Sequence, residues 1–225
     1  MIPVAALVVA KAPVPGLAKT RLAASIGAEA AADFAAAALL DTLDAVAATP
    51  VASRVVALTG DLAAAARSDD LRVRLADFTV VPQRGDGFAE RLVHAHADAS
   101  EAAGGLPVLQ IGMDTPQVTA ELLADCATAL TGADAVLGMA LDGGWWVLGI
   151  RNARSAECLG EVPMSRADTG AVTLAALRGT GIEVRLVSEL GDVDTIGDID
   201  VVGRACAPGT RFHRLAAAEG AWRAG

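Results

Sequence analysis

Three cationic side chains follow the first apolar run of the sequence. The stretch VVAKAPVPGLAKTRL, residues 8–22, carries Lys11, Lys19 and Arg21 together with Gly16 and two prolines. Fixed cations bind phosphates, and a glycine lets the backbone approach them closely. Prolines restrict the unfolded chain and so lower the cost of holding one loop shape. The stretch predicts a phosphate-binding loop, although solvent-exposed surface charges would give the same pattern if each residue stood alone.

Carboxylates recur at three later points of the chain. The segment IGMDTP supplies Asp114, LDGGWW supplies Asp142, and GDVDTIGD supplies Asp192, Asp194 and Asp198. A bound Mg²⁺ takes one or two protein carboxylates and fills its other positions with phosphate oxygens and water. Each segment also has an ordinary structural explanation, namely a helix cap or turn, a hairpin turn, and N-terminal helix charges. Cations on one loop and carboxylates on three others together favour a metal-nucleotide site.

Other polar and aromatic residues carry weaker signals. Trp145 and Trp146 are adjacent on an expected strand, so they face opposite sides, one toward the core and the other toward a pocket. His94 and His96 lie two apart on an expected helix and therefore make a poor metal pair. The segment QRGDGFAERL, residues 83–92, has glycines that would let the backbone approach a base or ribose. Its alternative explanation is a loop and helix start.

Short apolar runs alternate with helical patterns along the chain, and these elements must position the candidate residues. Alternation of this kind predicts an α/β fold, a three-layer α/β/α sandwich with a mostly parallel central sheet. The pattern predicts strands at 4–10, 55–58, 79–81, 107–111, 135–138, 145–150 and 183–187, and helices at 29–48, 87–103, 118–130, 169–177 and 194–206.

Ligands bind such sheets beyond the carboxyl ends of the strands, which is where the candidate residues fall. We therefore expect the cationic loop and the side chains of Asp114 and Asp194 to meet at one cavity. The sequence has no internal repeat and no convincing linker, so we expect a single domain over 1–225, with its regular part at about 4–206 and a C-terminal tail at 207–225.

Composition limits the classes of partner. The chain is 53% hydrophobic and carries a formal net charge of −9, which argues against binding to nucleic acid or to an anionic membrane. Cys126, Cys158 and Cys206 are odd in number and far apart, so we expect small buried hydrophobic residues rather than a disulfide or zinc framework. We see no signal peptide and no stretch long enough to span a bilayer, and expect a cytoplasmic protein. The sequence does not indicate an oligomeric state.

Five motifs in a fixed order carry a resemblance to a known family. KAPVPGLAKTRL, GDGFAERL, GMDTPQ, LDGGWWVLG and DVDTIGD together resemble the DUF2064 family, also described as CofC-like transferases. That family belongs to the nucleotide-diphospho-sugar transferase superfamily, and the resemblance implies its GT-A fold. The likeness runs from about residue 4 to residue 198. The family commonly has Ser-Asp-Cys-Pro where this chain has Met113-Asp114-Thr115-Pro116, and it prefers tyrosines at positions 145 and 146.

The resemblance also implies roles for individual residues. Catalytic roles would fall to Lys19, Arg21, Asp114 and Asp142. The implied nucleotide-binding residues are Ala10, Lys11, Gly16, Lys19, Arg21, Gly87 and Asp114. The implied acceptor-binding residues are Asp142, Gly143, Gly144 and Trp145, and the implied metal ligands are Asp114, Asp194 and Asp192.

These roles lead to one expected activity and two alternatives. We expect an Mg²⁺- or Mn²⁺-dependent nucleotidyltransferase that transfers a nucleotidyl group from a nucleoside triphosphate to a small anionic acceptor and releases pyrophosphate. One alternative is a glycosyltransferase that uses a nucleotide-diphospho-sugar, with Asp142 as a base or hydroxyl ligand. The other alternative is a nucleotide-binding relative without catalytic activity. The base and the acceptor are not specified by the sequence.

Overall fold

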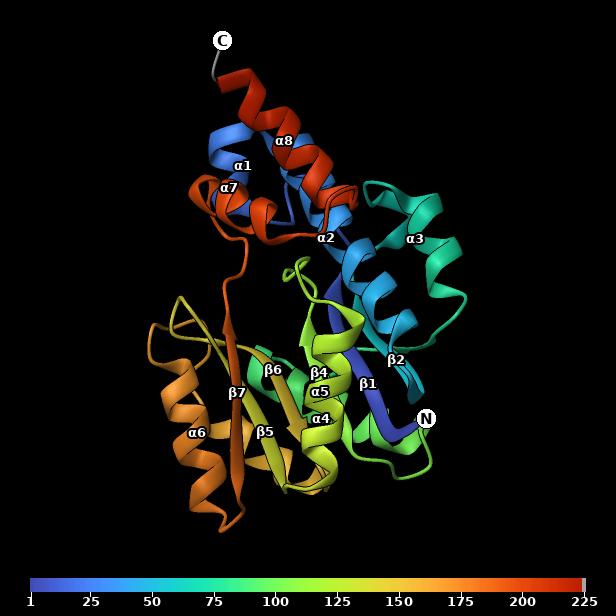
Figure 1. Cartoon of the computed structure of the whole chain (residues 1–225), viewed down its shortest axis with the longest axis vertical. Helices are drawn as coiled ribbons and strands as arrows, with labels where there is room; N and C mark the ends of the chain where they lie inside the picture. Colours follow the sequence, from blue (N-terminus) through green and yellow to red (C-terminus); the bar gives the residue numbers. More distant parts are fainter. Residues whose placement is uncertain (224–225) are drawn as a thin grey trace.

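The computed structural model of the chain, shown in Figure 1, describes residues 1–223. Within these residues the strands form one seven-stranded sheet in the order β3-β2-β1-β4-β6-β5-β7. Strand β6 runs antiparallel to β4 and β5, and the other neighbouring pairs are parallel. The strands are β1 (Ile2–Lys11), β2 (Val51–Thr59), β3 (Thr79–Pro82), β4 (Val108–Gly112), β5 (Ala135–Ala140), β6 (Trp145–Ile150) and β7 (Val184–Leu190).

Helices cover both faces of this sheet. On one face, α2, α3 and α5 bury the core that contains Leu39, Leu71 and Leu123. On the other face, α4, the 3-10 helix η2 and α6 bury Leu92, Leu159 and Leu177. The helices are α1 (Thr20–Ile26), α2 (Ala28–Ala48), η1 (Leu62–Ala64), α3 (Ser68–Leu75), α4 (Phe88–Ala102), α5 (Ala120–Thr131), η2 (Ala153–Glu161), α6 (Thr169–Gly179), α7 (Ile196–Ala205) and α8 (Arg211–Arg223). The predicted three-layer α/β sandwich is confirmed.

The central strand β1 shows why the sequence folds in this way. Its seven residues from Val4 to Ala10 are all buried, as expected for a strand covered on both faces. Side chains at even positions, such as Val8, join the α2 and α5 core, whereas Leu7 and Val9 join the α4 core. A continuous apolar run is therefore required here, and an alternating pattern would leave polar groups under a helix.

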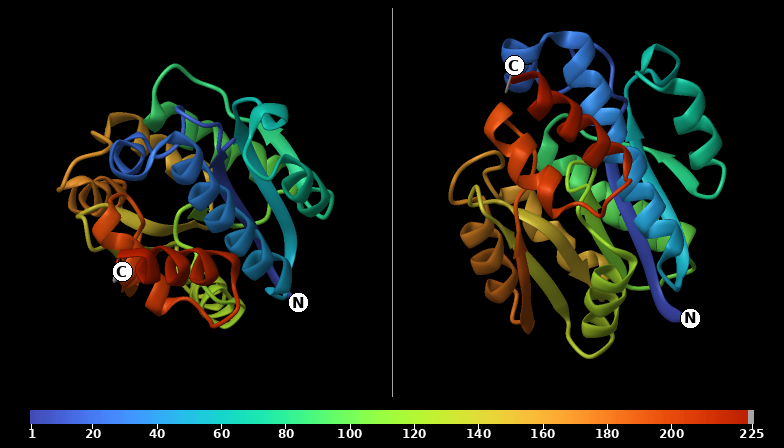
Figure 2. Two further views of the ribbon diagram at one scale, coloured as in Figure 1. Left: turned by 90° about the horizontal axis from the view of Figure 1, so that it is seen from above. Right: turned by 45° about the horizontal axis from the view of Figure 1, so that its top comes forward.

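A third group of helices lies beyond the carboxyl ends of the strands. Helices α1, α7 and α8 pack with the first half of α2, and Figure 2 shows them together above the sheet. The rings of Phe34 and Phe212 meet edge to face, with centroids 5.4 Å apart. This helical group lies over the edge at which the candidate residues leave the sheet.

Helix α8 replaces the irregular tail that the sequence predicted from residue 207. Its first backbone N–H groups, those of Arg211 and Phe212, donate to the buried carboxylate of Asp41 in α2 at 3.1 and 2.7 Å. The Arg211 guanidinium donates to the same carboxylate at 3.1 Å. A carboxylate at a helix start satisfies N–H groups that the helix itself leaves unpaired. The helix is thus stabilised by a residue about 170 positions away, which local patterns do not reveal.

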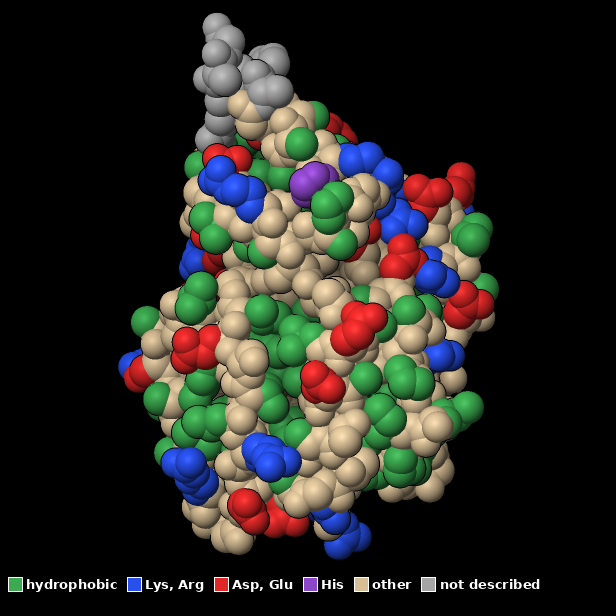
Figure 3. All heavy atoms as spheres, in the orientation of Figure 1, with side chains coloured by type: hydrophobic (Ala, Val, Ile, Leu, Met, Phe, Trp, Pro, Cys, Tyr) green, Lys and Arg blue, Asp and Glu red, His purple; other side chains and the backbone are tan. Residues whose placement is uncertain are grey.

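The edge strand β7 is less covered than the strands in the middle of the sheet. Figure 1 shows no helix in front of β7 on the viewed face, and Figure 3 shows hydrophobic side chains between β7 and α5. The strand carries exposed Arg185 and Glu189 beside its apolar residues. Charged side chains on an edge strand oppose pairing with a second sheet.

None of the helices within residues 1–223 combines the length and the apolar character that crossing a bilayer requires. The three cysteines are free in the described part of the chain. Cys126 and Cys206 are buried, as expected, and Cys158 is half-buried. Burial raises the pKa of the Cys126 thiol to about 11 and that of Cys206 to about 12, so both remain neutral thiols in the core.

Candidate functional site

The loop after β1 is held in one shape by its own hydrogen bonds. The N–H groups of Leu17 and Ala18 both donate to the carbonyl of Val14 at 3.0 Å. Gly16 adopts a φ of +76°, a conformation that glycine takes without steric cost. The Lys11 ammonium donates to the carbonyl of Leu17 at 2.8 Å, which ties the end of the strand to the loop.

This loop delivers Lys19 to two carboxylates. The Lys19 ammonium lies 2.8 Å from Asp114 and 3.8 Å from Asp194. Arg21 donates to the other oxygen of Asp194 at 2.5 Å. Asp114 follows β4, and Asp194 lies between β7 and α7. The predicted meeting of the cationic loop with the carboxylates of two distant strand ends is therefore confirmed.

Burial makes these charges depend on one another. The Lys19 side chain is only 12% exposed. Burial opposes its charged form, but the carboxylates of Asp114, Asp194 and Asp192 outweigh that cost and raise the pKa of Lys19. At Asp192, burial and the nearby charges of Asp114 and Asp142 raise the pKa to about 6. The like charges of Asp114, Asp142 and Asp192 therefore act on one another in this part of the site.

Asp198 has a structural part in this arrangement. Its carboxylate accepts the backbone N–H groups of Asp194 at 3.0 Å and Thr195 at 2.6 Å. Together with Thr195 it forms a capping box at the start of α7. Because the cap fixes the backbone of Asp194, it also orients the carboxylate that faces Lys19 and Arg21.

Two aspartates of the site are arranged in a way that fits a divalent cation. Asp114 and Asp194 both face one positive charge, the Lys19 ammonium, so they are already arranged around a cation. Two carboxylates are the number that a phosphate-bound Mg²⁺ takes from protein. No group of three or more His, Cys, Asp or Glu side chains within the described residues is arranged to hold a metal ion by itself. The donor set thus fits a metal that arrives with phosphate oxygens.

The turn between β5 and β6 is the acceptor loop of the sequence prediction. Asp142 accepts the N–H of Gly144 at 2.8 Å, which closes the turn. The carbonyl of Gly143 accepts the N–H of Gly170 at the start of α6, also at 2.8 Å. The structural explanation, a hairpin turn, is therefore correct, and the same turn borders the candidate site.

Gly143 provides a test of how tightly this loop is fixed. It has a φ of +90°, and a Cβ there would lie 1.9 Å from the carbonyl oxygen of Ala167. Replacing Gly143 by alanine should therefore cost on the order of 3 kcal/mol, a drop of roughly 6–12 °C in melting temperature. The matched control is Gly105→Ala, at a φ of +86° with no atom within 4 Å of the added Cβ. Equal melting temperatures for the two variants would contradict the close packing at Ala167.

The two tryptophans separate as the strand pattern predicts. Trp146 is 2% exposed and packs in the core on the α2 and α5 side, where its indole N–H donates to the carbonyl of Ser188 at 2.8 Å. Trp145 packs on the α4 side and lines the cavity described next. One residue is therefore structural, and the other faces the site.

These elements enclose a cavity of about 990 Å³. Among the predicted site residues, Ala10, Lys11, Arg21, Asp114, Asp142, Gly144, Trp145, Asp192 and Asp194 line it. Gly16, Lys19, Gly87 and Gly143 are not among the lining residues in the described part of the chain. Lys19 reaches the site through its ion pairs, and Gly143 supports the loop from behind.

Sequence reasoning found one wall of the cavity and missed others. The segment 83–92 was predicted to approach a ligand through its glycines, whereas the side chains of Gln83, Phe88 and Arg91 line the cavity. Gln110 of β4, which also lines it, was not predicted. The segment 164–167 closes a further side and contains Ser165 at a φ of +60°. A signal was available for Gln110, because it is a polar residue inside a buried strand. Nothing in the local pattern marks the segment before α6.

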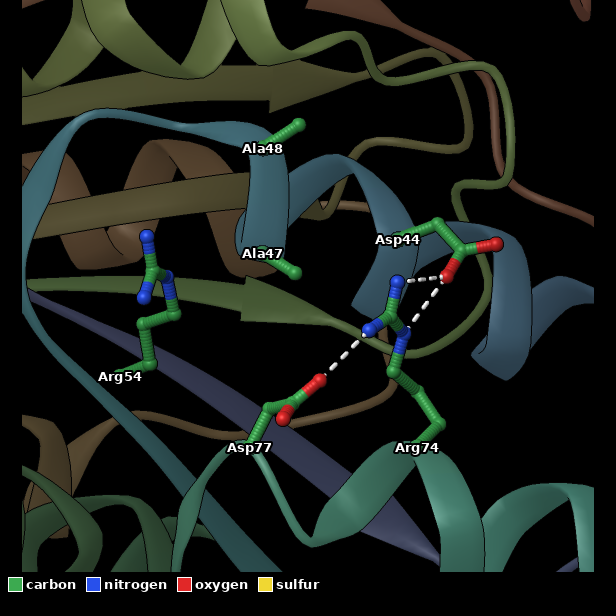
Figure 4. A pocket seen from close by; sticks show the side chains of 6 residues that line it. All are labelled: Asp44, Ala47, Ala48, Arg54, Arg74 and Asp77. Atoms are coloured by element: carbon green, nitrogen blue, oxygen red, sulfur yellow. Dashed lines mark hydrogen bonds and ion pairs between the residues drawn. The ribbon is translucent and has the colours of Figure 1, made fainter.

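A second hollow, of about 470 Å³, lies between the end of α2, β2 and α3 (Figure 4). Arg74 donates to Asp44 at 2.6 Å and to Asp77 at 2.8 Å. Arg54 donates to the backbone carbonyls of Val46 and Thr49. The arginines that line this hollow are therefore paired with carboxylates or with backbone carbonyls, which favours a structural role for the hollow.

Comparison with known proteins identifies the family. Residues 42–166, more than half of the chain, match DUF2064, described as "Uncharacterized protein conserved in bacteria". The chain belongs to the DUF2064 family. No curated protein matches this DUF2064 chain.

Solved structures share the fold of this DUF2064 protein. A "putative nucleotide-diphospho-sugar transferase" from Desulfovibrio desulfuricans G20 is 26% identical, with a TM-score of 0.83 over 98% of this chain and 96% of that one. Rv0371c from Mycobacterium tuberculosis H37Rv, in complex with manganese, is 18% identical, with a TM-score of 0.55 over 89% and 97%. A cytidylyltransferase from Leptospira borgpetersenii serovar Hardjo-bovis is 13% identical, with a TM-score of 0.56 over 90% and 85%. The fold is that of the nucleotide-diphospho-sugar transferases, as predicted.

Proposed function

We propose that this DUF2064 protein is a transferase that moves a nucleotidyl group from a nucleoside triphosphate to a small anionic acceptor. The observation that carries this proposal is the convergence of Lys19 and Arg21 with Asp114 and Asp194 at the cavity. Cations beside carboxylates at the ends of parallel strands suit a triphosphate that arrives with a divalent cation. The likeness to a cytidylyltransferase supports the same reading.

The reaction follows from these positions. An acceptor oxygen attacks the α-phosphorus of the triphosphate, the new oxygen–phosphorus bond forms, and the bond to the β-phosphate oxygen breaks to release pyrophosphate. Lys19 and Arg21 offset the negative charge that gathers on the leaving pyrophosphate. An acceptor that is already an anion has no proton to lose, so the reaction needs no general base. Lys11, Gly16 and Gly87 are the further residues of the proposed nucleotide site.

A divalent cation belongs to this proposal, held by Asp114 and Asp194 with Asp192 beside them. When bound, Mg²⁺ or Mn²⁺ would neutralise negative charge on the phosphates. The manganese complex of Rv0371c supports the use of such an ion in this fold. Burial raises the pKa of Asp192, and the negative charges of Asp114 and Asp142 raise it further, so a cation beside these aspartates would relieve their repulsion.

A second candidate is glycosyl transfer from a nucleotide-diphospho-sugar. Its support is the likeness to the Desulfovibrio desulfuricans protein, together with the Asp192-X-Asp194 spacing at the cavity. In that reaction Asp142 would bind a sugar hydroxyl or act as a base. One oxygen of its carboxylate accepts the N–H of Gly144, which leaves the other oxygen for such a role. The two cations of the loop after β1, Lys19 and Arg21, suit a triphosphate and favour nucleotidyl transfer.

One assay separates the candidates. The protein is incubated with each of the four nucleoside triphosphates, Mg²⁺ or Mn²⁺, and a panel of phosphorylated and carboxylated acceptors, and released pyrophosphate is measured. We expect pyrophosphate with at least one pair of substrates. Turnover of nucleotide-sugars alone would favour glycosyl transfer, and tight nucleotide binding without turnover of either donor would indicate a binding protein.

A further inference from the structure

The cavity has a polar wall that the metal and phosphate residues do not use. Arg91 of α4, Gln110 of β4 and Trp145 of β6 all line it. The Nε atom of Arg91 and the indole Nε1 of Trp145 are both buried, and neither has a hydrogen-bond partner among the described residues. Buried N–H donors are normally paired, so two unpaired donors beside one cavity mark this wall as a candidate ligand site.

The topology brings these side chains to one place. Val108 of β4 packs in the same core as Leu92 of α4, and Gln110, two residues further on, points to that same face. Strand β6 runs antiparallel beside β4 with Ile111 opposite Val147, so Trp145 lies beside the carboxyl end of β4. Trp145 also packs on the α4 side of the sheet.

Arg91 reaches the same edge from the helix above it. Helix α4 begins at Phe88, directly after the loop that follows β3, and it packs on β1, β2 and β4. Arg91 lies one turn into the helix, and its N–H donates to Gly87 at 3.0 Å. Arg91 and Trp145 therefore border the cavity from the layer above the sheet and from the sheet itself.

Arg91 differs from the other arginines that line the cavity. Arg21 is paired with Asp194, and Arg166 is paired with Asp168. Arg91 has no carboxylate within ion-pair distance among the described residues. The carboxylate of the adjacent Glu90 lies beside His94 instead and accepts the N–H of Asp86. An arginine is charged at all ordinary pH values, so Arg91 is a cation in the cavity wall with which an anionic ligand can pair.

The chemistry of the two donors defines the ligand. Guanidinium and indole groups donate hydrogen bonds and accept none, so together they suit an oxyanion. The amide oxygen of Gln110 on the same wall is also buried and unpaired, and it suits a hydrogen-bond donor elsewhere on the same ligand. The neighbouring ring of His96 is fully buried, and burial lowers its pKa to about 4, with the side chain of Gln110 acting in the opposite direction. The His96 ring is therefore neutral at pH 7. Arg91 is then the cation on this wall, and its single charge suits one anionic group.

We propose that Arg91 and the indole N–H of Trp145 bind the anionic group of the acceptor, a carboxylate or a phosphate. This proposal rests on the proposed function, and it assigns the acceptor's anion to the α4 side of the cavity. The phosphates of the nucleotide then bind Lys19 and Arg21, on the loop after β1. Trp145 directly follows Gly144 of the acceptor loop, which joins the two parts of the acceptor site.

The test uses inorganic phosphate and acetate as probes for the anion site. Each is titrated by calorimetry into the wild type, Arg91→Gln and Trp145→Phe. The phenylalanine keeps the ring and removes only the N–H donor. We expect at least a tenfold loss of affinity for one of the probes in Arg91→Gln and a smaller loss of about threefold in Trp145→Phe. Arg91→Lys keeps the charge without the fork of donors and should retain part of the affinity.

Two controls make the result specific. Arg84→Gln removes a cation of the same loop region that is already paired with Asp98, and it should bind both probes as the wild type does. Arg21→Ala removes a cation from the other part of the cavity and should weaken pyrophosphate binding more than acetate binding. Thermal unfolding of each variant shows whether it is folded.

Three outcomes would overturn the proposal. If Arg91→Gln and Trp145→Phe bind both probes as tightly as the wild type does, these residues do not form an anion site. A variant that changes the preference among the four nucleoside triphosphates, with phosphate and acetate affinities unchanged, would make this a base-binding wall. If Arg84→Gln lost as much probe affinity as Arg91→Gln, the loss would reflect the net charge of the protein and not a specific anion site. If no nucleotide is turned over but anion binding still depends on Arg91, the anion site stands and nucleotidyl transfer falls.

Discussion

Replacing Asp114 by asparagine is expected to lower the rate of pyrophosphate release at least about a hundredfold. The Asp114 carboxylate lies 2.8 Å from the Lys19 ammonium and, in the proposed function, holds the divalent cation with Asp194. Asparagine has the same size but no charge, so it weakens both interactions without creating a void. The rate is measured with saturating nucleotide, acceptor and Mn²⁺, so that a change in chemistry is seen rather than a change in occupancy.

The fold of this variant should be intact. The Asp114 side chain is 32% exposed, and α5 is capped by Thr119 rather than by Asp114, so no core contact or helix cap is lost. The matched control is Asp125→Asn, which removes a charge from an exposed position of α5. Activity of Asp114→Asn within about twofold of the Asp125→Asn variant would contradict the metal assignment.

The layers of the fold could be predicted from the sequence because they depend on local burial. The continuous apolar run of β1 and the long alanine- and leucine-rich α2 lie deep in the molecule, and both patterns were clear. Helix α3 was not predicted, because only Leu71 and Leu75 of its eight residues are buried and the rest is polar. Helix α1 begins at Thr20, directly after Lys19 in a left-handed conformation, and it has no side-chain cap, so no start signal is present.

The candidate site divides in the same way. Residues at strand ends, such as Asp114 and Asp194, could be predicted because parallel strands deliver their ends to one edge. Arg91 could not be assigned to the cavity, because its place depends on how α4 packs against the sheet. The cavity wall at Ser165 could not be predicted either, because its shape depends on the contact between Ala167 and Gly143. Tertiary packing decides such positions, and a single sequence carries little record of it.

Replacing Lys19 by methionine is expected to change two measurements in opposite directions. Methionine matches the length of lysine and has a Cβ of its own, so the left-handed backbone at φ 46° costs the same in both proteins. Loss of the ammonium should reduce pyrophosphate release at least about a hundredfold, because that charge offsets the leaving group. Binding of Mn²⁺ without nucleotide should instead become tighter, by roughly tenfold, because Asp114 and Asp194 lose the cation that now lies between them.

The control for this prediction lies on the same loop. Lys11→Met removes an equal charge, but the Lys11 ammonium donates to the carbonyl of Leu17 and pairs with no carboxylate in the described chain. Its Mn²⁺ affinity without nucleotide, measured by calorimetry, should therefore stay close to that of the wild type. If Lys19→Met binds Mn²⁺ no better than Lys11→Met does, the ammonium and the metal do not share a position. If they do share it, nucleotide and metal enter together, because the phosphates draw Lys19 away from the carboxylates that the metal requires.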